Sequence, residues 1–136
     1  MAFWLFKQEP DCYSFSDLER DGETVWDGIA NALARKHLRT VQVGDRVLFY
    51  HTGKEKAIVG EMIVSGPPTS DPKSEDKNAV VVKVKSVRKL ASPIKLDQIK
   101  KDTLLSKWDL VRLPRLSVVP MTEEQWKRIE EIQKEE

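Results

Sequence analysis

The residues best suited to bind a ligand lie in the segment Thr24–Asn31, where a large aromatic residue stands between a short β-branched run and a helix-like pattern. Trp26 offers a flat π-face on which a nucleotide base could stack. Asp27, the Gly28 amide and Asn31 offer hydrogen-bonding groups for the edge of that base. The alternative is structural, with Trp26 filling one end of a barrel and Asp27 capping the next helix. Residue types alone leave both interpretations open.

A second cluster of polar residues, Lys7-Gln8-Glu9-Pro10, follows an apolar run. It could be a solvated turn or, like the first segment, part of a ligand site. Arg35, Lys36 and Arg39 lie one and four residues apart, so they share one face of an expected helix. This face is either simply solvated or in contact with phosphates, and phosphate contact would make binding steeply salt-dependent.

Signatures of catalysis are mostly absent. The chain has no glycine-rich phosphate loop before a Lys-Ser/Thr pair and no G-x-S-x-G motif. Its histidines are His37 and His51, and Cys12 is its one cysteine, which excludes an intramolecular disulfide and a multi-cysteine zinc site. A nucleophile pair of Cys12 and His51 remains an alternative, although a cysteine is more often a small buried apolar residue. We therefore expect no cofactor, no metal and no enzymatic activity.

The composition is that of one globular domain. The 136 residues, 40% of them apolar, suffice for one core, so we expect a single domain over residues 1–136. The formal net charge of +1 argues against a protein that coats nucleic acid through bulk charge. From Met121 onward six carboxylates face three cations, and basic residues concentrate in Arg35–Arg46 and Lys83–Lys101. No apolar stretch could span a bilayer and no secretory signal is visible, so we expect a cytoplasmic protein, nucleoid-associated in a prokaryote.

Hydrophobic patterning predicts an α+β fold. The expected strands are Phe3–Lys7, Glu23–Trp26, Arg46–His51, Ala57–Val64, Ala79–Val87 and Leu116–Val119. The expected helices run from Ser14 to Gly22, near residues 29–39, from Leu96 to Lys101, and from Thr122 to Gln133. Residues 65–78 are rich in Pro, Ser, Asp and Lys and predict the least ordered stretch. Five or six short strands with a few helices favour a small, strongly curved sheet or pseudobarrel.

Several motifs resemble, in the same order, those of the EVE domain family. They are Trp-Leu-Phe-Lys-Gln-Glu-Pro-Asp-x-Tyr-Ser-Phe-x-Asp-Leu from Trp4, Trp26-Asp27-Gly28, Gly-Asp-x-Val-Leu-Phe-Tyr-His from Gly44, and the closing run Arg115–Trp126. The resemblance covers nearly the whole chain. It implies a PUA-like pseudobarrel with flanking helices, related to the YTH domains that read methylated adenine in RNA. EVE domains are proposed to take a modified base, notably a modified cytosine of DNA, into an aromatic-lined pocket.

The resemblance also implies site residues. Trp26 would be the stacking wall, with Lys7, Gln8, Asp27, Gly28 and Asn31 at the pocket edge, Tyr50, His51 and Thr52 opposite, and Arg35, Lys36 and Arg39 as possible backbone contacts. Taking a base out of a duplex costs a few kcal/mol, which stacking at about 1–3 kcal/mol and edge contacts must offset.

The chain departs from the family pattern in two places. After Trp-Asp-Gly the family usually reads Val-Arg-Asn-Tyr-Gln-Ala-Arg-Asn, whereas this chain reads Ile-Ala-Asn-Ala-Leu-Ala-Arg-Lys from Ile29, without that first arginine, the tyrosine and the glutamine. The family also tends to carry a longer segment with an aromatic residue between two later strands. Here no Phe, Tyr or Trp occurs between Tyr50 and Trp108, so a second wall would come from Tyr50 or Trp4, or be aliphatic.

The preferred hypothesis is that the chain is a non-catalytic reader of a modified base. DNA is favoured over RNA as its partner. An RNA base reader, a sensor of a free nucleoside or other planar ligand, and an enzyme using Asp27 or His51 as its base remain alternatives. The sequence leaves open whether the chain works beside a nuclease or methyltransferase.

Overall fold

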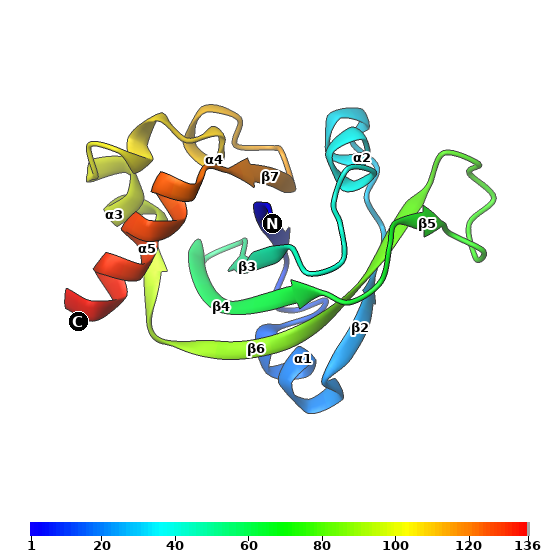
Figure 1. The fold of residues 1–136 in the computed structure, drawn as a ribbon, viewed down its shortest axis with the longest axis horizontal. Helices are drawn as coiled ribbons and strands as arrows, with labels where there is room; N and C mark the ends of the chain where they lie inside the picture. The colour runs from blue at the N-terminus through cyan, green and yellow to red at the C-terminus, as the bar shows by residue number, and fades with distance from the viewer. Residues whose placement is uncertain (136) are drawn as a thin grey trace.

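A seven-stranded sheet forms the centre of the computed structural model, which describes residues 1–135 (Figure 1). The strands are β1 (Phe3–Gln8), β2 (Glu23–Trp26), β3 (Arg46–His51), β4 (Ala57–Val64), β5 (Thr69–Ser70), β6 (Val80–Lys95) and β7 (Val118–Met121). Their order is β2-β6-β4-β3-β1-β7, and β5 pairs with β6 beside this path. The pair β1/β3 is parallel, and the other pairs are antiparallel. The expected α+β fold is confirmed, with seven strands in place of five or six.

The long strand β6 bends the sheet. It sweeps beneath the other strands in Figure 1, and its pairing with β4 shifts register between Ile58 and Gly60 and again between Glu61 and Met62. The strand was expected to end at Val87. This was wrong, because the first register shift accommodates Pro93 within the strand. Lys89 and Ile94 are paired and residues 90–93 are not, so the missing proline N–H costs no ladder hydrogen bond.

The helices are α1 (Phe15–Asp21), α2 (Ala32–Leu38), α3 (Leu96–Lys101), α4 (Asp109–Arg112) and α5 (Glu123–Glu135), with a 3-10 turn η1 (Leu105–Lys107). The first begins as expected, since Ser14 Oγ accepts from the Asp17 amide at 3.1 Å while Asp17 Oδ2 accepts from the Ser14 amide at 2.8 Å. α2 begins three residues later than the pattern suggested. Its cap is Asn31, whose Oδ1 accepts from the Ala34 amide at 2.9 Å, so Asp27 is not the cap. The short helices within residues 105–112 were not predicted.

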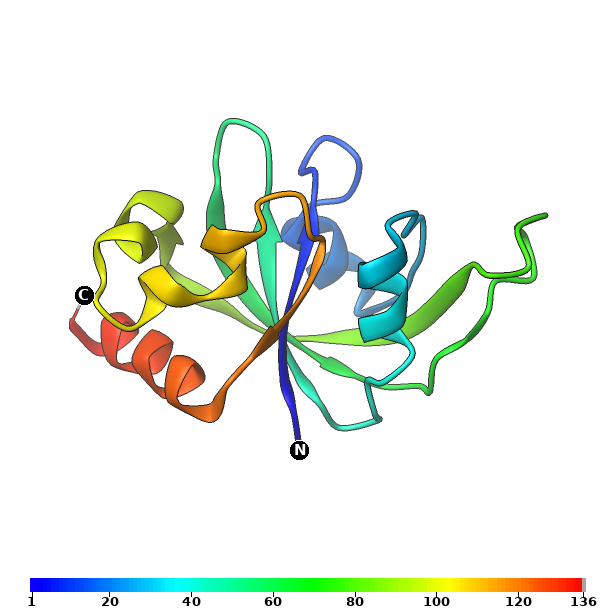
Figure 2. The same ribbon diagram turned by 90° about the horizontal axis from the view of Figure 1, so that it is seen from above.

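Apart from α1, the helices gather at the two ends of the sheet. α3, α4 and α5 lie together at one end, and α2 and the segment around β5 lie at the other (Figures 1 and 2). Trp4, Trp108 and Trp126 are buried in the core, as expected. Residues 65–78 are more regular than their composition suggested, because β5 pairs with β6 and the loop carries further backbone bonds, such as the Asp71 amide to the Ala79 carbonyl at 3.2 Å. Within residues 1–135 no helix has the length and apolar character needed to cross a bilayer.

Candidate functional site

Four chain segments meet around a hollow of about 310 Å3, which we name the β1 hollow. It is lined by the end of β1, the residues after β2, the residue after β3 and the segment before β7, namely Lys7, Gln8, Glu9, Asp27, Gly28, Ile29, Thr52, Pro114, Arg115 and Ser117. The sheet explains the convergence. β1 and β3 are parallel with Gln8 opposite His51, so both strands end at the same edge. Figure 2 shows the loops after β1 and β3 side by side.

The antiparallel strand β7 brings the fourth segment to this edge. Phe6 pairs with Val118, and the Lys7 amide donates to the Ser117 carbonyl at 2.9 Å. The Lys7 ammonium donates to the Pro114 carbonyl at 2.8 Å and lies 5.6 Å from the Tyr50 ring centroid. Burial lowers the pKa of Lys7. The site thus holds a partly desolvated cation that is fixed in position.

Thr52 supplies an unused hydrogen-bonding group in the lining. Its amide donates to the Gln8 carbonyl at 3.0 Å, which ties the ends of β1 and β3 together. Its Oγ1 is buried and has no hydrogen-bond partner among the described residues. A buried polar group left unpaired costs about 1–3 kcal/mol. A ligand that hydrogen-bonds this hydroxyl would recover that cost.

Arg115 supplies a second cation, at the mouth of the hollow. It is exposed, and within residues 1–135 its guanidinium forms no ion pair or hydrogen bond. It also lines an adjoining groove of about 280 Å3 together with Asn31, Leu33 and Arg112. The predicted residue Asn31 therefore belongs to this groove and not to the hollow itself. Arg115 is available to contact a phosphate or a base edge.

Trp26 does not line the hollow. Its side chain is 2% exposed and packs with ring centroids 5.6 Å from Phe6 and 5.2 Å from Phe49. The alternation of β2 explains this, because Trp26 and its buried partner Val82 point to the core while Val25 points outward. An open stacking wall was expected, but the indole has no free face in this structure. Its Nε1 is buried without a partner among the described residues, and its stacking role stays a prediction.

Tyr50 and His51 are also buried, at 3% and 8% exposure, and neither reaches the hollow. His51 Nε2 accepts from the Phe15 amide at 3.0 Å, so Nδ1 carries the proton and donates to Glu55 Oε1 at 2.6 Å. Of the three residues expected opposite Trp26, only Thr52 lines the hollow. Both His51 nitrogens are engaged within the fold, which leaves neither for Cys12. Cys12 is exposed, so it is not the buried apolar residue that a cysteine more often is.

Arg35 of α2 and Arg39, the residue after this helix, hold the loop before β6. Arg35 Nη1 lies 2.8 Å from Asp76 Oδ2, and Arg35 Nε donates to the Ile29 carbonyl at 2.6 Å. Arg39 donates to the Asn78 carbonyl at 2.9 Å, whereas Lys36 is exposed. The Asn78 amide and then Arg35 lower the pKa of Asp76. The expected open face of three cations is thus partly occupied by the chain itself.

Five of the predicted residues share the hollow: Lys7, Gln8, Asp27, Gly28 and Thr52. Glu9 also lines it and belongs to the polar cluster Lys7–Pro10, for which a ligand site was one alternative. The lining residues that were not predicted are Ile29, Pro114, Arg115 and Ser117. Arg115 and Ser117 stand in the closing motif, which was the available signal. No aromatic ring lines the hollow among the described residues, so its apolar walls are aliphatic, from Ile29 and Pro114. Within residues 1–135 no group of three or more His, Cys, Asp or Glu side chains could hold a metal ion.

The chain resembles proteins of known sequence and structure over nearly its whole length. Thymocyte nuclear protein 1 of Rattus norvegicus is 31% identical over 158 residues, which cover 91% of this chain and 70% of that protein. The human THYN1 protein, whose crystal structure was solved in complex with 5-methylcytosine-containing DNA, superposes with a TM-score of 0.92 at 26% identity. That match covers 100% of this chain and 99% of the human one.

A more distant likeness concerns the fold alone. The ASCH protein of Zymomonas mobilis superposes with a TM-score of 0.62 at 13% identity, covering 94% of this chain and 93% of that one, in line with the expected PUA-like fold.

The family model of the EVE domain matches residues 2–132. The chain therefore belongs to the EVE domain family.

Proposed function

We propose that the chain binds a modified base of nucleic acid in the β1 hollow and does not change it chemically. A modified cytosine in DNA is the preferred ligand. The observation that carries the proposal is the likeness to the human THYN1 protein, which was crystallised with 5-methylcytosine-containing DNA and superposes over the whole chain. The β1 hollow is proposed as the location because Lys7, Asp27 and Arg115, which belong to three of the motifs, line it.

The hollow suits a single base in size and polarity. Its volume of about 310 Å3 falls at the lower end of the range of about 300–1,000 Å3 for small-molecule sites. Thr52 Oγ1 and the Gly28 amide can hydrogen-bond a base edge, while Ile29 and Pro114 offer apolar contact for a methyl group. The Asp27 carboxylate can accept from an exocyclic amino group such as that of cytosine.

A free nucleoside is the second candidate ligand. It is favoured by the pairing of Arg35 with Asp76, which leaves α2 less able to contact phosphates. The two candidates differ in salt dependence, because only a polymer releases counterions in proportion to its phosphate contacts.

The test is a titration of the protein with short single and double strands of DNA and RNA. Each carries cytosine, 5-methylcytosine or 5-hydroxymethylcytosine, and tryptophan fluorescence is followed at two salt concentrations. We expect preferential binding of one modified DNA strand. A preference for RNA would reassign the polymer, and binding of the mononucleoside alone, insensitive to salt, would support the sensor. Equal affinity for modified and unmodified strands would contradict the proposal.

Thr52→Val removes the unpaired hydroxyl with little change of shape, and Thr103→Val, at an exposed position away from the hollow, is its control. If Thr52 bonds the base, its variant loses about tenfold affinity for the modified strand, the equivalent of about 1.4 kcal/mol. The control should bind as the wild type does. Equal affinity of both variants would remove Thr52 from the contact set.

A further inference from the structure

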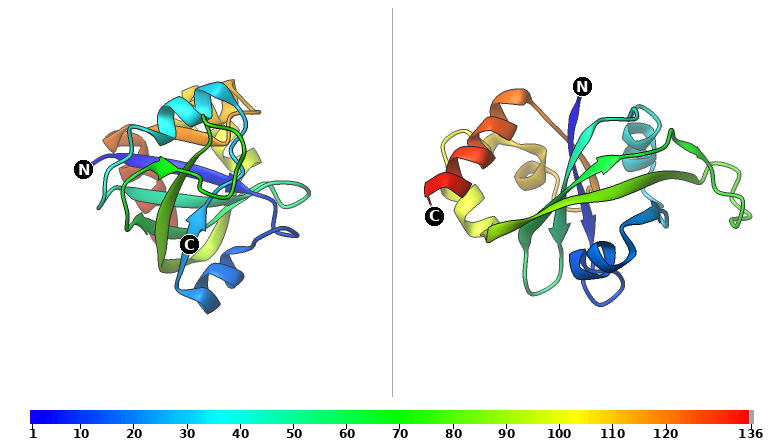
Figure 3. Two further views of the ribbon diagram at one scale, coloured as in Figure 1. Left: turned by 90° about the vertical axis from the view of Figure 1, so that its right-hand side faces the viewer. Right: turned by 60° about the horizontal axis from the view of Figure 1, so that its bottom comes forward.

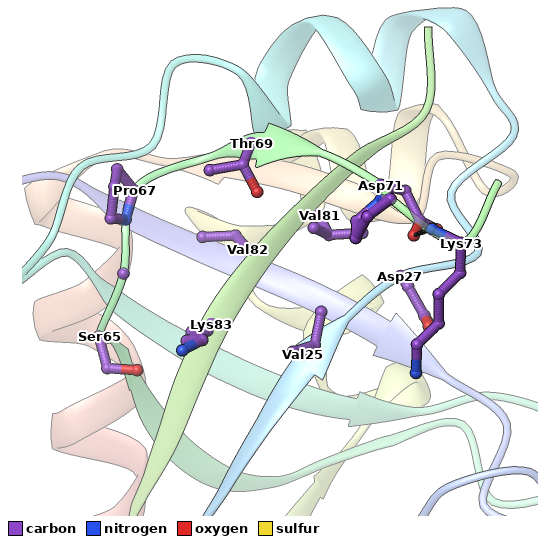
Figure 4. A pocket seen from close by; sticks show the side chains of 12 residues that line it. Val25, Asp27, Ser65, Pro67, Thr69, Asp71, Lys73, Val81, Val82 and Lys83 are labelled. Atoms are coloured by element: carbon purple, nitrogen blue, oxygen red, sulfur yellow. Dashed lines mark hydrogen bonds between the residues drawn. The ribbon is translucent and has the colours of Figure 1, made fainter. Parts of the chain in front are cut away.

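A second cavity, of about 550 Å3, lies on the outer face of β2 and β6. Residues 65–73, which we name the strap, cover it. Figure 4 shows Val25 of β2 and Val81 and Lys83 of β6 facing this space, with Thr69 and Lys73 of the strap around it. We name it the outer cavity. Its volume lies within the range of about 300–1,000 Å3 for small-molecule sites.

The strap is fastened to β6 along its length. The Ser65 amide donates to the Lys83 carbonyl at 2.8 Å, and Thr69 pairs with Val81. Gly66 lets the strap approach closely, because a Cβ added there would lie 3.2 Å from Lys83 Cβ. The views in Figure 3 show the strap and β6 leaving the body of the sheet together. The strap therefore forms a wall of the cavity.

The cavity combines an apolar surface with unpaired cations. Val25 is 45% exposed although it belongs to a strand, so a ligand lying over it would remove apolar surface from water. The ammonium groups of Lys73 and Lys83 form no ion pair or hydrogen bond with any residue in 1–135. Asp71 accepts from the Lys73 amide at 2.9 Å. The carboxylates of Asp27 and Asp71 line the same cavity, so the lining suits a ligand that has an apolar ring, a negative group and an amino group.

One residue joins this cavity to the β1 hollow. Asp27 lines both, since it follows the last residue of β2. Its carboxylate disfavours a phosphate at the shared boundary and favours an amino group of a base there. Lys83 of β6 pairs with Val25 of β2. This pair lies one step further from Asp27 than the pair of Trp26 and Val82 does. A nucleotide in the cavity would therefore have its base toward Asp27 and its phosphate near Lys83.

We propose that the outer cavity holds the nucleotide next to the modified one, with its base over Val25 and Val81 and its phosphate at Lys83. This inference rests on the proposed function of the β1 hollow, and it makes the chain a reader of two consecutive nucleotides. Continuity through Asp27 and the unpaired lysines select a nucleotide as the occupant. A neutral peptide would leave both lysine charges unused.

Single strands with a central 5-methylcytosine test the flanking base. One probe carries both neighbouring bases, a second has an abasic site in place of the 5′ base, and a third has an abasic site in place of the 3′ base. Wild type should lose about three- to tenfold affinity for one of the abasic probes, as expected for a stacked base. Val25→Ser should abolish that difference. Val87→Ser, at an exposed β6 valine outside the cavity, should keep it.

Lys83→Gln tests the phosphate, and Lys85→Gln is its matched control, two residues along the same strand face and outside the cavity. On single strands, the slope of log K against log salt should become less steep by about 0.7 for Lys83→Gln. It should stay at the wild-type value for Lys85→Gln. Circular dichroism and thermal unfolding establish that all four variants fold.

The outcomes separate the two proposals. The wild-type protein could prefer the modified strand and yet bind the intact and the abasic probes equally. This result overturns the flanking site and leaves the proposal for the β1 hollow unaffected. Equal slopes for the two lysine variants overturn the phosphate assignment. Wild type with no preference for the modified base overturns the proposed function, and the flanking site falls with it.

Discussion

Lys7 Nζ donates a 2.8 Å hydrogen bond to the carbonyl oxygen of Pro114, which joins the end of β1 to the segment before β7. This contact holds two walls of the β1 hollow together. Burial lowers the pKa of Lys7 below its usual value of 10.5, so the folded protein releases this proton at a lower pH than the unfolded chain does.

Lys7→Met keeps the apolar stem and removes the charge. The contribution of Lys7 to stability should rise with pH between its lowered folded pKa and 10.5, because the unfolded chain binds more protons in that window. Urea unfolding of wild type and Lys7→Met from pH 8 to 10.5 measures this difference. Lys54→Met, in the exposed turn after β3, is the control. A constant difference between wild type and Lys7→Met would contradict the assignment.

His51→Ala should lower the free energy of unfolding by about 1–3 kcal/mol, because the Phe15 amide loses its acceptor in a buried setting. Chemical denaturation at neutral pH measures the loss. His37→Ala is the control, since no hydrogen bond to its ring is present within residues 1–135 and its side chain is only partly buried. Equal losses for the two variants would show that the Phe15 contact contributes nothing specific.

Trp26→Ala should destabilise the protein by about 3–5 kcal/mol, since it leaves a cavity against Phe6 and Phe49. An exposed stacking wall could be removed without such a loss, so the burial of Trp26 makes lower stability the first expected effect of the substitution. Trp26→Phe keeps most of the packing and removes the unpaired Nε1. If the indole takes part in binding, Trp26→Phe folds like wild type and binds the modified strand more weakly. Unchanged affinity would exclude Trp26 from the site.

Asp76→Asn tests whether Arg35 of α2 can contact a phosphate. The substitution removes the carboxylate that pairs with Arg35 at 2.8 Å. If Arg35 then engages a phosphate, affinity for every strand should rise alike and the salt slope should steepen by about 0.7–0.9. Glu75→Gln, in the same loop, exposed and without an ion pair in the described residues, is the control. An unchanged slope for Asp76→Asn would assign Arg35 to loop anchoring alone.

Local patterns predicted many elements because those signals are short-range. The bounds expected for Arg46–His51, Ala57–Val64 and Leu96–Lys101 are those of β3, β4 and α3. The end of β6 was missed because a bulge around Pro93 depends on the partner strand β4. The turns within residues 105–112 carry too few residues for a helical period to appear.

The site was predicted in part, for similar reasons. Lys7 and Gln8 are the last residues of β1, and Asp27, Gly28 and Thr52 come directly after β2 and β3. Such positions at strand ends can be found from the chain alone. Arg115 lines the hollow because β7 runs antiparallel to β1, which is a tertiary relation. The residue type of Trp26 indicates stacking ability, but the side of β2 that faces the core is decided by pairing with β6.

A base that enters the β1 hollow should change the NMR chemical shifts of the backbone amides that line it. Titration with a short DNA strand that contains 5-methylcytosine should move the amide signals of Gly28, Thr52 and Ser117, which line the hollow. The same strand with unmodified cytosine should move them less at equal concentration. Shifts confined to other surfaces, such as α5, would contradict the account.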